Sequence, residues 1–118
     1  MSWVDYASAP APGTPICRES EAGAVNVLTI TTGKGDFPVL LLHTAQGWRA
    51  YVNACPHQYL PLNYRGEQLV SADGAKLICT AHGAQFDIYS GQVIHGAGCG
   101  LDAIPIEIAD GEIRITLI

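Results

Sequence analysis

Cys55-Pro56-His57 and Cys79-Thr80-Ala81-His82 are the two stretches of this sequence that decide its fold. Each places a histidine two or three residues after a cysteine, and residues 58–78 separate them. Because this spacing lets a tight loop direct a thiolate and an imidazole toward one centre, two such loops can supply four ligands. Sulfur and nitrogen ligands suit zinc or an iron–sulfur cluster better than magnesium or calcium. The pattern therefore predicts a metal centre in this part of the chain.

The surroundings of these stretches resemble the Rieske family, whose pattern is Cys-x-His, a spacer and then Cys-x-x-His-Gly. The resemblance covers most of the chain and extends to Leu62, Gly83, Phe86-Asp87, Gly91 and residues 101–105. It implies an all-β fold, a Rieske-type antiparallel β-sandwich with a smaller inserted cluster-binding lobe at about residues 54–92. It also implies one [2Fe–2S] cluster per chain.

The resemblance assigns the metal ligands residue by residue. Cys55 and Cys79 would bind a buried iron, and His57 and His82 would bind an outer iron. Neutral imidazoles in place of two thiolates leave the cluster less negative, so its reduction potential rises above that of all-cysteine clusters. We expect no catalytic residue, because the chain is predicted to carry electrons and not to convert a substrate.

Four further positions predict a low potential. High-potential members of the family have a disulfide between the ligand loops, and a serine and a tyrosine that hydrogen-bond to sulfur. Here these positions hold Leu60, Ala81, Ala84 and Phe86, whose side chains can neither form a disulfide nor donate a hydrogen bond. We therefore expect a potential toward the lower end of the Rieske range of roughly −150 to +300 mV.

The resemblance implies redox protein partners, a reductase on one side and a terminal oxygenase on the other. An alternative is a small accessory subunit of a larger oxidoreductase such as a nitrite reductase. A Cys2His2 structural zinc domain is a chemical alternative, although zinc modules usually pair Cys-x-x-Cys with distant histidines. A further alternative is a protein module that kept the fold and lost its metal.

Composition agrees with a single domain spanning residues 1–118. The 13 glycines and 7 prolines lie among short apolar runs, which favours strands and turns over helices.

A net charge of −5 argues against nucleic-acid binding, which depends on cationic side chains. No run could span a bilayer and the first residues lack a signal-peptide pattern, so we expect a cytoplasmic protein without a membrane partner. The role of Cys17 and Cys99 stays open.

The strands are expected between turn signals. Residues 1–23, rich in proline and alanine, predict an extended entry segment, with the core beginning at residue 24. A mostly apolar strand over 38–44 is expected to have both faces covered. The other expected strands are 24–32, 48–53, 68–71, 76–80, 86–89, 92–94, 104–108 and 113–118.

Overall fold

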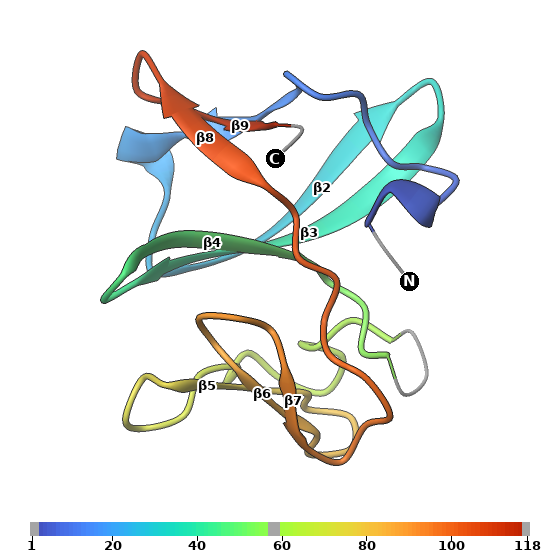
Figure 1. Ribbon diagram of the computed structural model, residues 1–118, viewed down its shortest axis with the longest axis vertical. Coiled ribbons are helices and arrows are strands. Elements are labelled where there is room, and N and C mark those ends of the chain that lie inside the picture. Colours follow the sequence, from blue (N-terminus) through green and yellow to red (C-terminus); the bar gives the residue numbers. More distant parts are fainter. Residues whose placement is uncertain (1–2, 57–59, 117–118) are drawn as a thin grey trace.

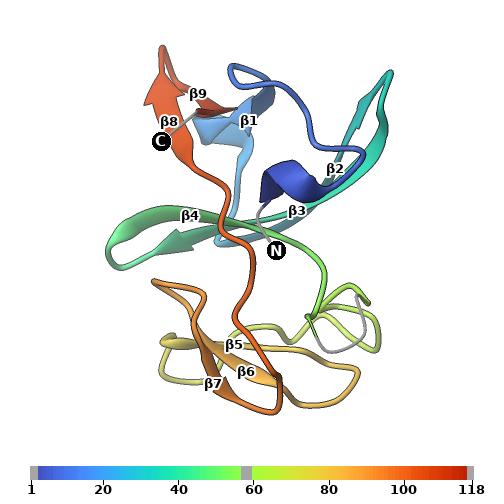
Figure 2. The same ribbon diagram turned by 45° about the vertical axis from the view of Figure 1, so that its right-hand side comes forward.

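The computed structural model describes residues 3–56 and 60–116 and is built from three antiparallel sheets of three strands each. Figures 1 and 2 show the sheet β2–β3–β4 in the middle, with β1, β8 and β9 on one side and β5, β6 and β7 on the other. Two short 3-10 helices, η1 (Trp3–Asp5) and η2 (Glu19–Glu21), complete the described elements. No helix in these ranges is long and apolar enough to cross a membrane. The expected all-β class is confirmed.

The central sheet consists of β2 (Val25–Thr32), β3 (Gly35–Thr44) and β4 (Gly47–Val52). Residues 39–42 of β3 are at most 1% exposed, which confirms that both faces of this strand are covered. Since side chains alternate along a strand, Val39 and Leu41 enter one buried cluster while Leu40 and Leu42 enter the other. The central sheet therefore divides the interior into two cores.

The outer sheet has the order β1 (Pro15–Arg18), β9 (Glu112–Ile115), β8 (Ile106–Ala109). The prediction that the core begins at residue 24 is wrong. β1 pairs with β9, while Trp3 and Ala9 are 7% and 9% exposed and belong to the first core. Pro15 is compatible with β1 because it is the first residue of an edge strand.

The third sheet, in the order β5 (Lys76–Ile78), β6 (Gln85–Asp87), β7 (Val93–His95), lies in the predicted lobe. Residues 68–71 were expected to form a strand, but only Val70 forms an isolated bridge, with Leu77. Backbone hydrogen bonds flank this bridge, because the Ser71 amide donates to the Lys76 carbonyl oxygen at 3.0 Å and the Ile78 amide donates to that of Leu69 at 2.7 Å. The side chains of Ser71 and Asp73 bond each other and the backbone of residues 75 and 76, which fixes the turn between the two segments. The Leu69 amide donates to the Glu67 carbonyl oxygen at 3.0 Å, so the pairing does not extend to residue 68.

Tyr51 and Arg49 of β4 connect the central sheet to the lobe. The Tyr51 hydroxyl donates a hydrogen bond of 2.7 Å to the Ile88 carbonyl oxygen, and this tyrosine is 1% exposed. Arg49 Nε donates to the Tyr89 carbonyl oxygen at 3.1 Å. Both bonds reach the segment after β6, so β4 holds the lobe at this point.

We expect Tyr51 to ionise at a higher pH than an ordinary tyrosine side chain. Burial raises its pKa to about 12 from the ordinary tyrosine value of 10.0, and Asp87 adds to the rise while Arg49 opposes it. Because the folded pKa lies above the unfolded one, this group stabilises the fold fully below pH 10, and the contribution is lost as pH rises through about 12. Ultraviolet titration should show one late tyrosine that disappears in Tyr51→Phe. A late step that survives this substitution would contradict the assignment.

Candidate metal centre

The two cysteine loops are closed by the same kind of backbone hydrogen bond. The Cys55 amide donates to the Leu60 carbonyl oxygen at 2.7 Å, and the Cys79 amide donates to that of Ala84 at 2.8 Å. Each bond spans five residues. The second loop is tightened further because the Gly83 amide donates to the Cys79 carbonyl oxygen at 2.7 Å. Both cysteines thus begin a segment whose first residue is bonded to the residue five positions later.

The two predicted cysteine ligands are buried, whereas the predicted histidine ligand that the structure describes is exposed. Cys55 is 1% exposed and Cys79 is fully buried, and both belong to the second core. His82 is exposed at the surface of its loop. His57 lies outside the described residues, so its prediction as a ligand stays a prediction.

The two loops are joined through Leu62, which is fully buried in the same core. Its carbonyl oxygen accepts hydrogen bonds from the Thr80 amide at 2.8 Å and from the Thr80 hydroxyl at 2.6 Å. Its amide donates to Asn53 Oδ1 at 2.8 Å. Asn53 and Thr80 are not among the residues predicted from the sequence, since a lone amide and a lone hydroxyl form no distinctive pattern.

The donor chemistry of the described residues suits a mixed cysteine and histidine cluster. Two thiols lie in one apolar core, where thiolates need a cationic metal to offset the cost of burying their charge. An imidazole is available at the adjoining surface on the Cys79 loop. Among the described residues, which leave out His57, no group of three or more His, Cys, Asp or Glu side chains is close enough to hold a metal ion. Cys55, Cys79 and His82 are all described, so the structure does not bring these three predicted ligands together as such a group.

The positions that predict a low potential have apolar surroundings. Ala84 and Phe86 are fully buried and pack in the second core, with Ala81 in contact with it. None of these side chains has a hydroxyl or thiol to donate to a cluster sulfur. The structure thus places apolar groups, and no side-chain donors, at these three positions.

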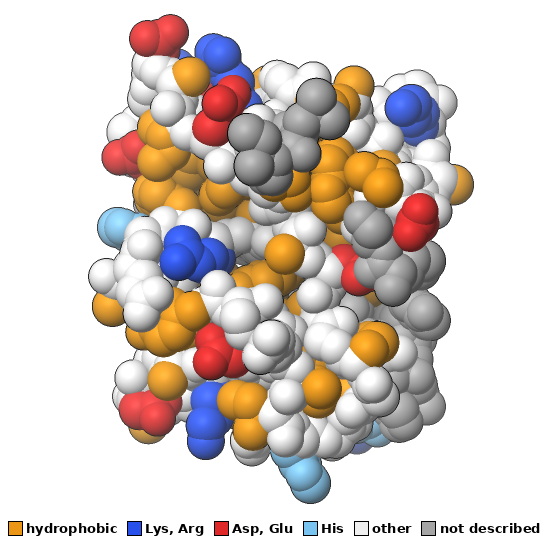
Figure 3. All heavy atoms as spheres, in the orientation of Figure 1, with side chains coloured by type: hydrophobic (Ala, Val, Ile, Leu, Met, Phe, Trp, Pro, Cys, Tyr) orange, Lys and Arg blue, Asp and Glu red, His pale blue; other side chains and the backbone are white. Residues whose placement is uncertain are grey.

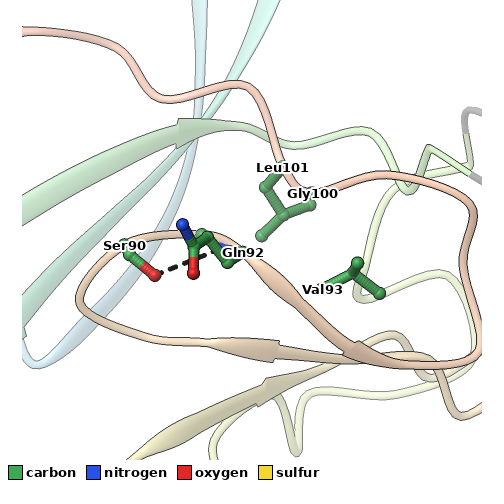
Figure 4. A pocket seen from close by; sticks show the side chains of 6 residues that line it. Ser90, Gln92, Val93, Gly100 and Leu101 are labelled. Carbon is green, nitrogen blue, oxygen red and sulfur yellow. Dashed lines mark hydrogen bonds between the residues drawn. The ribbon is translucent and has the colours of Figure 1, made fainter.

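Figure 4 shows a hollow lined by residues that follow β6 and by residues that precede β8. It has a volume of about 350 Å³ between the turn after β6 and the segment before β8, and its lining consists of Ser90, Gly91, Gln92, Val93, Gly100 and Leu101. None of these described lining residues has a titratable side chain. Figure 3 shows charged side chains of both signs scattered over one face, without a concentrated patch. The described residues that line this hollow supply no acid or base to activate the Ser90 hydroxyl for substrate chemistry.

Comparison with known proteins identifies the family. The Rieske [2Fe-2S] domain model matches residues 14–104. The ferredoxin component of the alkene monooxygenase system of Xanthobacter autotrophicus is 36% identical over 81 residues, which are 69% of this chain and 63% of that protein. This chain thus spans a little under two thirds of that relative's length.

Solved structures share the fold. A ferredoxin of Sphingomonas yanoikuyae B1 matches with a TM-score of 0.70 and 20% identity, over 90% of this chain and 99% of that one. A putative small subunit of an NADPH nitrite reductase matches with a TM-score of 0.67 and 13% identity, over 91% and 100% of the two chains. The family match implies a [2Fe–2S] cluster as cofactor. This chain belongs to the Rieske [2Fe–2S] domain family.

Proposed function

We propose that this protein is a one-electron carrier whose [2Fe–2S] cluster is held by Cys55, His57, Cys79 and His82. The observation that carries the proposal is the pair of matched loops, each starting at a buried cysteine. When bound, the cluster supplies a one-electron redox centre. The buried thiols would hold its inner side, and the exposed His82 would bring its outer side to the surface. The family match and the ferredoxin relative support this reading.

Electron transfer is proposed to run from a reductase to a terminal oxygenase. The relative with 36% identity is a component of a monooxygenase system, which supports an oxygenase as the acceptor. Pro61 and Tyr64 are exposed on the segment that follows the first loop, and Pro56 and Leu60 are partly exposed on that loop. A mostly apolar rim of this kind suits a brief encounter over a small interface.

The proposal includes a single domain over residues 1–118 and a cytoplasmic location.

The function is tested by single-turnover electron transfer. Chemically reduced protein is mixed with candidate oxygenases under anaerobic conditions, and cluster reoxidation is followed by visible absorption. We expect reoxidation only with a cognate oxygenase, and no product from substrate mixed with the carrier alone. Isolation of the native protein in a stable complex with a large oxidoreductase subunit would instead favour the accessory-subunit alternative.

We expect a midpoint potential near the bottom of the Rieske range, at about −150 mV. The reason is that residues 81, 84 and 86 place only apolar side chains in and beside the second loop. Potentiometric titration followed by electron spin resonance measures this value. Phe86→Tyr should raise it if the added hydroxyl reaches a cysteine sulfur. A wild-type potential well above zero would contradict the prediction.

A further inference from the structure

We propose that Thr80 and Asn53 are positioning residues that act together through the Leu62 peptide to hold the two cysteine loops in a fixed relation. This inference rests on the proposed function, since it takes Cys55 and Cys79 as ligands. It adds two residues that do not touch the cluster in the proposal but determine where its thiolates lie. We call the set Asn53, Leu62 and Thr80 the Leu62 clamp.

Thr80 forms the half of the clamp on the second loop. It directly follows Cys79, and both its amide and its hydroxyl donate to the Leu62 carbonyl oxygen, at 2.8 and 2.6 Å. The same hydroxyl accepts a hydrogen bond of 2.9 Å from the Arg65 amide. Because the hydroxyl both donates and accepts, its rotation is fixed, and the backbone next to Cys79 is fixed with it.

Asn53 forms the half on the first loop. It lies two residues before Cys55 and is 4% exposed, the only buried polar side chain among the described residues. Its Oδ1 accepts from the Leu62 amide at 2.8 Å, and its Nδ2 donates to Asn63 Oδ1 at 3.1 Å. Its own amide donates to the Pro38 carbonyl oxygen of β3 at 3.1 Å. The clamp is thereby anchored to the central sheet.

The backbone amide and the backbone carbonyl of Leu62 thus connect two separate loops. The Leu62 amide is bonded to the residue that precedes the first loop, and its carbonyl to the residue after Cys79. The Leu62 side chain packs in the core that contains both cysteines. Two thiolates on separate loops can bind one iron only if their separation is fixed, and neighbouring hydrogen bonds commonly supply that constraint.

The test compares three variants of the cluster-containing protein. Thr80→Val removes the hydroxyl at nearly constant volume, and Thr80→Ser retains it. Thr14→Val is the matched control, because the Thr14 hydroxyl also donates to a carbonyl oxygen at 2.6 Å, that of Ala11, in the entry segment far along the chain from the ligands. The readouts are the electron spin resonance line shape of the reduced protein and the rate of iron loss to a chelator.

We expect Thr80→Val to shift and broaden the resonance lines and to speed iron loss about tenfold or more, in line with lost support of metal ligands. Thr80→Ser should restore both readouts, and Thr14→Val should leave both unchanged. If Thr80→Val assembles no cluster, a normal cluster in Thr80→Ser still supports the clamp, and a missing one overturns it. Equal readouts for Thr80→Val and Thr14→Val also overturn it. A wild-type protein without any cluster would instead refute the proposed function itself.

Discussion

Cys79→Ala should give a colourless protein without a [2Fe–2S] cluster. Cys79 is fully buried and its loop is closed at both ends by hydrogen bonds to Ala84 and Gly83, so no other side chain can replace the missing thiolate. Loss of one of four ligands leaves an iron without its full coordination. Visible absorption and iron content per chain measure the loss, which should be complete.

The chain supplies its own controls for this experiment. Of its four cysteines, Cys17 lies in β1 and Cys99 is exposed in the loop before β8, and neither belongs to the predicted ligand set. Burial and the nearby Glu21 carboxylate raise the pKa of Cys17, which makes its thiolate scarcer. Cys17→Ala and Cys99→Ala should keep full iron content. An iron-loaded Cys79→Ala would remove Cys79 from the assigned ligands, and an iron-free Cys99→Ala would contradict the exclusion of Cys99 from the ligand set.

Gly91→Ala should destabilise the fold by about 2–4 kcal/mol, the sum of backbone strain and overpacking. Gly91 has a φ of +77°, and a Cβ built on it would lie 2.7 Å from Cε1 of Tyr51. That tyrosine ring is buried and bonded to Ile88, so it cannot move aside without breaking the link between the central sheet and the lobe. Urea unfolding followed by circular dichroism measures the change in the free energy of unfolding.

Gly74→Ala separates the two contributions. Gly74 has nearly the same φ, +73°, but no heavy atom lies within 4 Å of its built Cβ. The free energy of unfolding should therefore fall by only about 1 kcal/mol in Gly74→Ala, which is the cost of the left-handed conformation. The late ionisation of Tyr51 should also shift in Gly91→Ala and stay unchanged in Gly74→Ala. Equal losses in the two variants would show that contact with Tyr51 does not matter.

Local sequence features predicted most of the architecture. Hairpins around Ser90-Gly91 and Asp110-Gly111 have clear turn residues between short runs that contain aromatic or β-branched residues, and the strand over 38–44 is apolar enough to require cover on both faces. The structure has these elements as β6–β7, β8–β9 and β3. The entry segment was misjudged because β1 pairs with β9, almost a hundred residues away, and no local pattern encodes such a partner.

By itself, the sequence determined the family, the cofactor and the expected ligand set, because metal ligands must be particular residue types at particular spacings. Only the tertiary structure decided how these ligands are supported. Asn53 and Thr80 are common polar residues whose role depends on meeting the same Leu62 peptide from two directions. Likewise, position 91 requires glycine because the Tyr51 ring lies against it. Such contacts join residues far apart in the chain, so they exist only once the sheets have packed together.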